Sequence, residues 1–209
     1  MTSTAITANA PVLVCGSTTE GEEELVLVAF RQVLQQFPNT LMVLAPRHPE
    51  RFEKAAALIA SAGLPLVKRS TWSPQTGAPI RPGSIFLLDS VGELASIYAL
   101  ADIAFIGGSL VPLGGHNILE PAQHGVAVLT GPHTFNFREI VRIFETGGGL
   151  RVITADNLGS SITSLLHNAE EREQLGRRAR ELFLENTGAT GKTVAGLQLL
   201  LTGNTAATQ

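Results

Sequence analysis

The chain has 209 residues, 44% of them hydrophobic, which is enough for the core of one ordinary domain and too few for two. Fifteen Lys and Arg against 18 Asp and Glu give a formal net charge of −3, so no chain-wide positive field favours a nucleic acid partner. A single cysteine excludes an intrachain disulfide framework, and no uninterrupted apolar stretch reaches the length of about 18 residues that a membrane span needs. These features favour a cytoplasmic protein.

Seven short apolar runs alternate with stretches of helical spacing along the chain. The alternation is typical of strand and helix units around a parallel sheet, and most runs are apolar on both faces, as buried parallel strands are. The predicted strands are Val12–Cys15, Thr40–Leu44, Pro65–Val67, Ser84–Leu88, Ile103–Ile106, Val126–Leu129 and Leu150–Ile153. The predicted helices are Glu20–Gln36, Pro49–Ala62, Glu93–Ala101, Ile118–His124, Phe135–Thr146 and further helices from about Asn157 to Leu201.

The pattern predicts one doubly wound α/β domain over residues 11–201. Residues 1–10 and 202–209 are small and polar, so we expect a linker or disordered start and a disordered tail. Residues 70–83 are rich in proline and glycine and are expected to form a loop. Because ligands bind at the carboxyl ends of strands in such sheets, the residues after each strand are the candidates for a site.

Polar residues follow the first predicted strand. Ser17 and Thr18 can cap the next helix, and the acidic residues after them oppose its positive end. The sequence leaves two interpretations open, a capped surface helix or a small polar cradle for a ligand.

Cationic residues follow the second predicted strand at a helix start. Arg47 and His48 come directly after Pro46. A guanidinium group offers a bidentate fork to a carboxylate or phosphate, and helix-start amides add further donors. This arrangement indicates an anion site, with a surface pair between Arg47 and Glu50 as the alternative.

The fourth and fifth predicted strands lead into the remaining candidates. Ser90 and Glu93 flank Gly92 and have the spacing of a capping box. After the fifth strand, residues 107–121 hold four glycines, an imidazole, an amide and a carboxylate, and successive glycine amides can surround a phosphate. Glu120 lies about one turn inside the following helix, where it can accept two ribose hydroxyls. His116 and Glu120 have the spacing of a metal-ligand pair, but no third ligand is near in sequence, so no metal is expected.

Several short blocks occur in a fixed order along the chain: GSTTEGEEE at 16–24, PRHPERF at 46–52, DSVGEL at 89–94, AFIGGSLV at 104–111, GGHNILEP at 114–121, then Gly131-Pro132 and Asn136-Phe137. Their order resembles the 3-deoxy-D-manno-octulosonic acid (Kdo) transferase family of lipopolysaccharide synthesis, from about Pro11 to Leu201. Members of that family are about twice this long, with two Rossmann-like domains of the glycosyltransferase-B type. This chain resembles the C-terminal, sugar-nucleotide-binding half.

The resemblance implies a reaction and a set of contacts. The family transfers Kdo from CMP-Kdo to a lipid A precursor, with inversion and without a required metal or cofactor. The resemblance implies that the segments at 46–47, 91–93 and 117–120 bind CMP, although Val91 stands where much of the family has methionine. Together with the candidates above, the expected substrate-binding residues are Ser17, Pro46, Arg47, His48, Val91, Gly92, Glu93, Gly108, Ser109, Gly115, His116, Asn117, Ile118, Leu119 and Glu120. Amides near residues 107–109 and 114–117 are expected to meet the phosphate.

The resemblance also implies what lies outside this chain. The general base is a carboxylate of the N-terminal half, which also binds the lipid A precursor, so we assign no catalytic residue here and expect little or no turnover without that acceptor domain. The full-length family member is expected at the cytoplasmic face of the inner membrane. Two alternatives stay open: a non-catalytic nucleotide-binding module, and a fragment resembling a UDP-sugar transferase or 2-epimerase.

Overall fold

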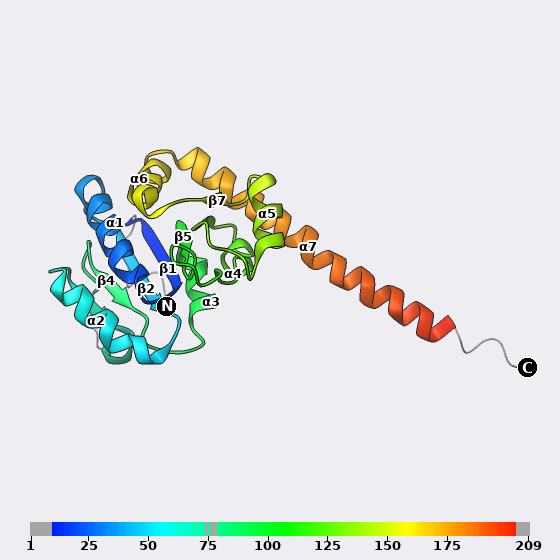
Figure 1. The fold of residues 1–209 in the computed structure, drawn as a ribbon, viewed down its shortest axis with the longest axis horizontal. Helices are drawn as coiled ribbons and strands as arrows, with labels where there is room; N and C mark the ends of the chain where they lie inside the picture. The colour runs from blue at the N-terminus through cyan, green and yellow to red at the C-terminus, as the bar shows by residue number, and fades with distance from the viewer. Residues whose placement is uncertain (1–9, 74, 76–78, 204–209) are drawn as a thin grey trace, which may run out of the picture.

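The computed structural model describes residues 10–73, 75 and 79–203, with side chains described as far as residue 187. Its centre is a parallel sheet with the strand order β3-β4-β2-β1-β5-β6-β7 (Figure 1). All seven predicted strands are present and the doubly wound architecture is confirmed. The strands are β1 Val12–Thr18, β2 Leu41–Pro46, β3 Leu66–Lys68, β4 Ile85–Leu87, β5 Ile103–Ile106, β6 Ala127–Thr130 and β7 Arg151–Val152.

Helices connect the strands on both sides of the sheet. They are α1 Glu22–Gln36, α2 Phe52–Ser61, α3 Leu94–Ile97, α4 Leu119–Ala122, α5 Arg138–Thr146, α6 Leu158–His167 and α7 Ala169–Gly203. Short 3₁₀ turns lie at Pro49–Arg51, Arg69–Thr71, Tyr98–Leu100 and Ala155–Asn157. Each predicted helical stretch contains a helix, in most cases with a later start or a shorter length than predicted.

The shifted helix ends have local causes. Helix α1 begins at Glu22, not Glu20, because Gly21 adopts a left-handed conformation with φ 83° just before it. Neither Ser17 nor Thr18 caps this helix, so the capping expected of them is wrong. The C-terminal helical stretch divides at Asn168, whose side-chain oxygen accepts a hydrogen bond from the amide of Glu171 in α7.

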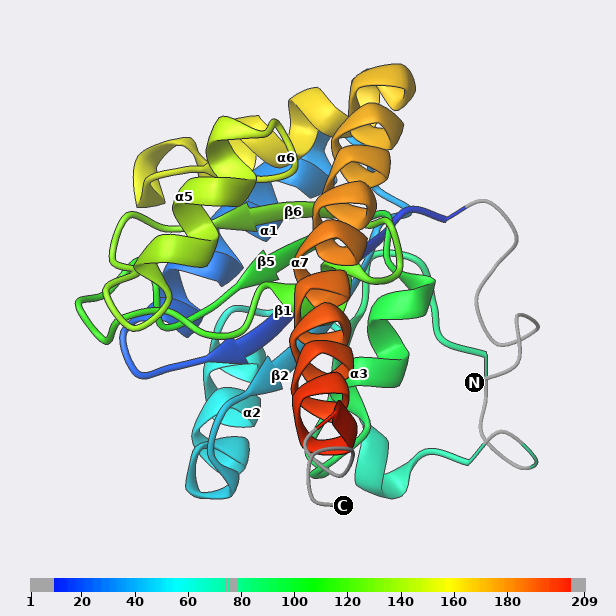
Figure 2. The ribbon, with the colours of Figure 1, turned by 90° about the vertical axis from the view of Figure 1, so that its right-hand side faces the viewer.

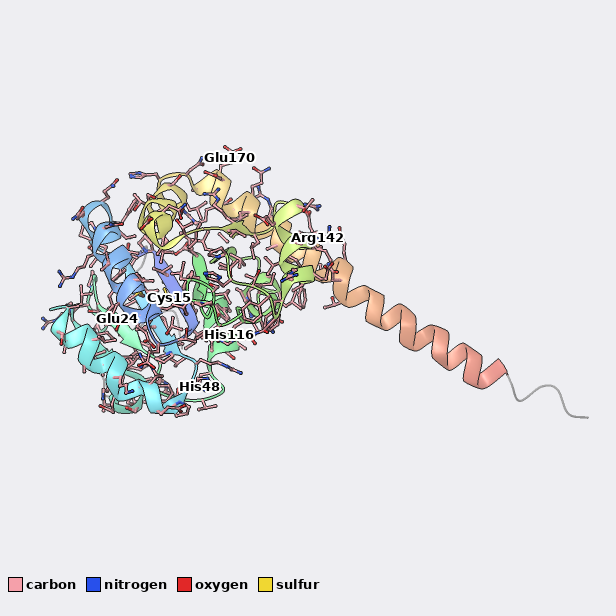
Figure 3. The ribbon with its side chains drawn as sticks, in the orientation of Figure 1. Cys15, Glu24, His48, His116, Arg142 and Glu170 are labelled. Carbon is pink, nitrogen blue, oxygen red and sulfur yellow. The ribbon has the colours of Figure 1, made fainter. Side chains whose placement is uncertain are left out.

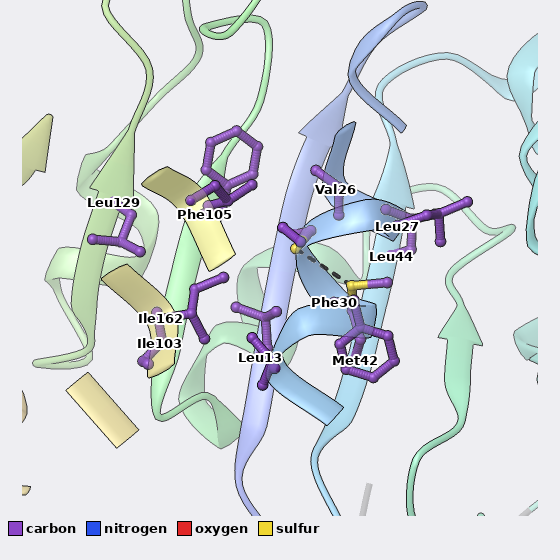
Figure 4. Close-up of a cluster of buried hydrophobic side chains, with 14 of the residues drawn as sticks. Leu13, Val26, Leu27, Phe30, Met42, Leu44, Ile103, Phe105, Leu129 and Ile162 are labelled. Atoms are coloured by element: carbon purple, nitrogen blue, oxygen red, sulfur yellow. Dashed lines mark hydrogen bonds between the residues drawn. The ribbon is translucent and has the colours of Figure 1, made fainter. Parts of the chain in front are cut away.

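Each face of the sheet packs against its own set of helices. One face, with Leu13 and Phe105, packs against α1, α2 and α6 (Figure 4). The other face, with Val14 and Ile106, packs against α3, α4 and α5. Helix α7 contributes to both clusters near its start and then extends beyond the domain body (Figures 1 and 2). Almost every residue of the five inner strands is therefore buried, as the two-sided apolar runs predict, whereas the edge strands β3 and β7 are only partly buried.

The terminal segments add two observations. Residues 1–9 and 204–209, most of the predicted disordered ends, lie outside the described residues, and α7 continues to Gly203. Within the part of the chain that the structure describes, no helix combines the length and hydrophobicity needed to cross a membrane.

Candidate functional site

The candidate site lies where the sheet changes winding direction. The chain proceeds from β1 to β2 on one side, and β5 returns to pair with the other side of β1. Ligands of open parallel sheets bind at the carboxyl ends of strands beside such a switch point. Here β1 ends in a bulge at Ser17, which has a φ of 54°, the one positive φ outside glycine among the described residues.

Three cationic or ionisable groups, Arg47, His48 and His116, lie close enough near this point for their charges to interact. Arg47 and His48 follow β2 and are exposed, and neither side chain has a hydrogen bond or ion pair within the described part of the chain. The surface ion pair between Arg47 and Glu50, which the sequence offered as the alternative to an anion site, is therefore not formed in the described structure. His116 is half-buried, and its Nε2 is buried without a hydrogen-bond partner among the described residues. Figure 3 labels His48 and His116.

The environment of His116 shifts its protonation. Burial lowers the pKa of His116 below 6.5 because it disfavours the charged ring, and repulsion from Arg47 and His48 lowers it further, while the Glu22 carboxylate acts in the opposite direction. An anionic ligand placed among these groups would meet the exposed, unpaired guanidinium of Arg47, whereas the unpaired Nε2 of His116 is buried against Gly108. The arrangement therefore suits a phosphate or carboxylate.

The structure corrects the predicted role of the first glycine turn. The amides of Gly108 and Ser109 donate to the carboxylate of Glu22 at 2.6 and 2.8 Å, so they do not point free donors at a phosphate. Ser109 is fully buried, and its hydroxyl donates to the Ile106 carbonyl and accepts from the Gly131 amide. Ser109 therefore supports the loop and has no free group to offer a ligand.

The second glycine segment keeps free amides. The Gly115 amide donates to the Gly108 carbonyl at 2.7 Å. The amides of His116, Asn117 and Ile118 make no hydrogen bond within the described residues. Of the amides predicted from the sequence to meet a phosphate, those of 107–109 and Gly115 already donate to protein acceptors, whereas those of Gly114, His116 and Asn117 do not in the described structure.

Glu120 is held at the start of α4 by its neighbour Asn117. The Asn117 side-chain amide donates to Glu120 at 3.3 Å, and its oxygen accepts from the Leu119 amide at 3.1 Å. Glu120 is half-buried and keeps a free carboxylate oxygen, whereas the Ile118 side chain is fully buried in the core. Any ligand contact of Ile118 is therefore limited to its backbone.

Tyr98 lies beneath this segment and was not found by sequence reasoning. Its side chain is buried, and burial together with the Glu120 carboxylate raises the pKa of its hydroxyl. The hydroxyl also lies against Gly16 at the end of β1. A lone tyrosine in a helical stretch carries no sequence signal for such a position.

The predicted turn at 91–93 is exposed at its tip and anchored at its base. Val91 is 80% exposed, and Gly92 has a φ of 89°. Glu93 accepts hydrogen bonds from Ser90 at 2.5 Å and from Arg69 at 2.9 Å, which together lower its pKa. The Glu93 carboxylate therefore shapes the turn, and Val91 and Gly92 are its accessible members.

Two buried glutamates at the start of α1 contradict a surface position for this helix end. Glu22 and Glu23 are both fully buried. Glu23 pairs with Arg51, which also pairs with Glu20 at 2.9 Å. Burial raises the pKa of Glu23 despite this pairing. The run of acidic residues gave no signal of which carboxylates turn inward.

The thiol of Cys15, the single cysteine, is buried and is not available to a ligand. Cys15 is buried in the sheet, where burial raises the pKa of its thiol, and it contacts Met42 at 3.7 Å (Figure 4). Among the described residues, no group of three or more His, Cys, Asp or Glu side chains could hold a metal ion.

Comparison with known proteins decides the family. No family model matches the chain. The 3-deoxy-D-manno-octulosonic acid transferase of Haemophilus influenzae is 44% identical over 181 residues, covering 86% of this chain and 42% of the relative. The crystal structure of the C-terminal CMP-Kdo binding domain of WaaA from Acinetobacter baumannii is 34% identical with a TM-score of 0.76, covering 84% of this chain and 90% of that domain. The chain belongs to the Kdo transferase family.

The family membership confirms the resemblance and the fold class predicted from the sequence. The Kdo transferase of Bordetella pertussis is 36% identical over 192 residues, covering 90% of this chain and 44% of the relative. The chain thus spans less than half the length of these curated Kdo transferases. Its similarity to the WaaA domain places it at the C-terminal part of such a protein.

Proposed function

We propose that this chain binds CMP-Kdo and forms the donor-binding half of a Kdo transferase that acts on a lipid A precursor. The main support for the proposal comes from Arg47 and His116 at the switch point. Arg47 has no ion pair among the described residues, and it lies near His116, whose Nε2 has no hydrogen-bond partner there. Similarity to a CMP-Kdo binding domain supports it. The free amides of 116–118 supply further donors for the anion.

Different residues contact different parts of the donor, CMP-Kdo. Arg47 and His48 face the phosphate or the Kdo carboxylate, and Glu120, held by Asn117, accepts the ribose hydroxyls. As the bond to Kdo breaks, negative charge grows on the departing cytidylate phosphate. Fixed positive charge and amide donors stabilise that charge more in the transition state than in the bound substrate, which lowers the barrier.

The acceptor side of the reaction belongs to the remaining part of the longer protein. We propose that the general base and the lipid A precursor site lie there, at the cytoplasmic face of the inner membrane. A base must reach the acceptor hydroxyl, and the inward-facing carboxylates Glu22 and Glu23 are buried. The purified chain should bind CMP without transferring Kdo. Full turnover of CMP-Kdo with a lipid acceptor by this chain alone would overturn that part of the proposal.

Calorimetric titration with CMP and with UMP tests the donor site. We expect CMP to bind more tightly than UMP, and Arg47→Ala to weaken CMP by about tenfold or more because a charge-assisted contact is lost. Glu120→Ala should also weaken CMP. Arg81→Ala and Glu145→Ala serve as matched controls, because both side chains are exposed and have no partner among the described residues.

The same titration separates the alternatives. Preference for UMP would favour a UDP-sugar enzyme. If neither nucleotide binds to a folded chain, the proposed donor site is wrong.

A further inference from the structure

Glu22 has an unusual set of partners for the first residue of a helix. One carboxylate oxygen accepts from the amide of Gly108 at 2.6 Å and from the amide and hydroxyl of Thr19 at 3.2 and 3.0 Å. The other accepts from the amides of Ser109 and Leu110, each at 2.8 Å. The side chain is fully buried. Three consecutive backbone amides that converge on one anion form a nest, and here the anion is the protein's own carboxylate.

Helix capping accounts for only part of this arrangement. The bonds to Thr19 join a residue just before α1 to the first residue of the helix and have the three-residue spacing of a capping box. The bonds to residues 108–110 join two segments 86 to 88 residues apart in the chain. The neighbouring Glu23 is equally buried, yet it pairs with Arg51 of the following helix start and makes no hydrogen bond to the glycine turn within the described residues. The contact with the turn is therefore specific to Glu22.

The turn that Glu22 holds supports the donor-binding residues directly. A Cβ atom on Gly107 would lie 2.5 Å from the Ser17 carbonyl, and one on Gly108 would lie 2.8 Å from Nε2 of His116. The Gly108 carbonyl also accepts from the Gly115 amide. The backbone of the turn is thus packed between the end of β1 and the His116 ring, so its position determines where that ring lies.

We infer that Glu22 is a positioning residue of the donor site, which fixes the 107–110 turn and through it the placement of His116 opposite Arg47. The inference rests on the proposed CMP-Kdo site. It assigns Glu22 no contact with the nucleotide, because its oxygens are already filled by protein donors. Glu22→Gln tests it, since the amide has the same shape but turns an N–H group toward N–H donors.

The control is Glu23→Gln, which changes the adjacent buried carboxylate in the same helical turn. We expect Glu22→Gln to weaken CMP binding by about tenfold or more, and Glu23→Gln to leave it within about twofold, when both are compared at equal folded fraction. Calorimetry measures the binding, and urea unfolding measures the folded fraction. Equal CMP affinities for the two variants would overturn the inference.

An NMR titration of His116 gives a readout that does not depend on CMP. The charged groups that act on its ring are Arg47 and His48 at the end of β2 and Glu22 of α1. Because the Glu22 charge favours the protonated ring, the pKa of His116 should fall in Glu22→Gln and stay unchanged in Glu23→Gln. An unchanged pKa of His116 in folded Glu22→Gln would contradict the inference.

The outcomes separate this inference from the proposed function. If the wild-type chain fails to bind CMP, the proposed function fails, whereas the His116 titration still decides whether Glu22 acts on that ring. If Glu22→Gln does not fold, Thr19→Val replaces it, because this change removes one of the five hydrogen bonds to Glu22. It should weaken CMP binding by a few-fold, and unaltered binding would then count against the inference.

Discussion

Close contact between Gly16 and Tyr98 places a tight steric limit on the floor of the site. A Cβ atom on Gly16 would lie 1.9 Å from the Tyr98 hydroxyl and 2.8 Å from the ring carbon that bears it. Gly16 does not have a positive φ, so the constraint is space and not backbone conformation. Here glycine is required because a side chain from another element occupies the volume.

Gly16→Ala should destabilise the chain by about 1–3 kcal/mol, since the methyl group overpacks a filled site. Tyr98→Phe should recover part of that loss, because it removes the oxygen that makes the closest contact. Urea unfolding of the two single variants and the double variant measures the coupling. Strictly additive losses would show that the methyl group is accommodated elsewhere.

His116 should make the stability of the chain depend on pH. Its pKa is lower in the folded protein than the ordinary value of 6.5, so the unfolded chain takes up a proton more readily. The stability that the fold gains from a neutral His116 ring is therefore complete above pH 6.5. It is lost as the pH falls toward the lowered pKa of His116 in the folded protein. Wild type should lose more stability than His116→Gln between about pH 7.5 and 5.5, measured by urea unfolding. An equal loss in both would show that other groups cause the dependence.

At the scale of elements, one arginine joins the starts of α1 and α2. Arg51 is buried beside the fully buried Glu23 and reaches the exposed Glu20 with its other nitrogen. Burial raises the pKa of Glu23 and the Arg51 charge lowers it, so the carboxylate depends on this partner. The pair therefore joins the starts of α1 and α2.

Arg51→Ala should destabilise the fold by about 3–5 kcal/mol, because it leaves a buried carboxylate without its counter-charge. Lys68→Ala is the control. Lys68 pairs with an exposed glutamate, Glu53, so its loss should cost about 0–1 kcal/mol. Chemical denaturation measures the loss of stability in both variants. Similar losses would show that water reaches the Glu23 carboxylate. Adding Glu23→Gln to Arg51→Ala should restore part of the stability.

Sequence periodicity predicts elements well where both faces of a strand are apolar. β5 matches its predicted bounds, Ile103–Ile106, because hydrophobicity alone determines its burial. The site was predicted less completely. Arg47, His116 and Glu120 were found because they follow predicted strands, whereas the inward turn of Glu22 depends on a contact with residues 108–110. Local patterns do not distinguish a carboxylate that binds a distant loop from one that faces solvent.

At the scale of the whole molecule, exposed apolar side chains gather on the edge that carries the site. Val91, Leu113 and Phe135 are 80%, 51% and 53% exposed and follow β4, β5 and β6, respectively. Asn136 joins two of the loops by donating to the Leu113 carbonyl. All three side chains therefore lie at the carboxyl edge of the sheet. Apolar surface gathered in this way is typical of an interaction face.

Because these three apolar side chains are exposed, we expect this edge of the sheet to be available for association in solution. Purified chain should then self-associate as its concentration rises, and the double variant Leu113→Ser/Phe135→Ser should reduce the mass measured by light scattering. Val28→Ser/Leu184→Ser changes two comparably exposed residues on α1 and α7 and should leave the mass unchanged. A monomer at every accessible concentration, or equal effects of the two double variants, would show that this edge does not drive association.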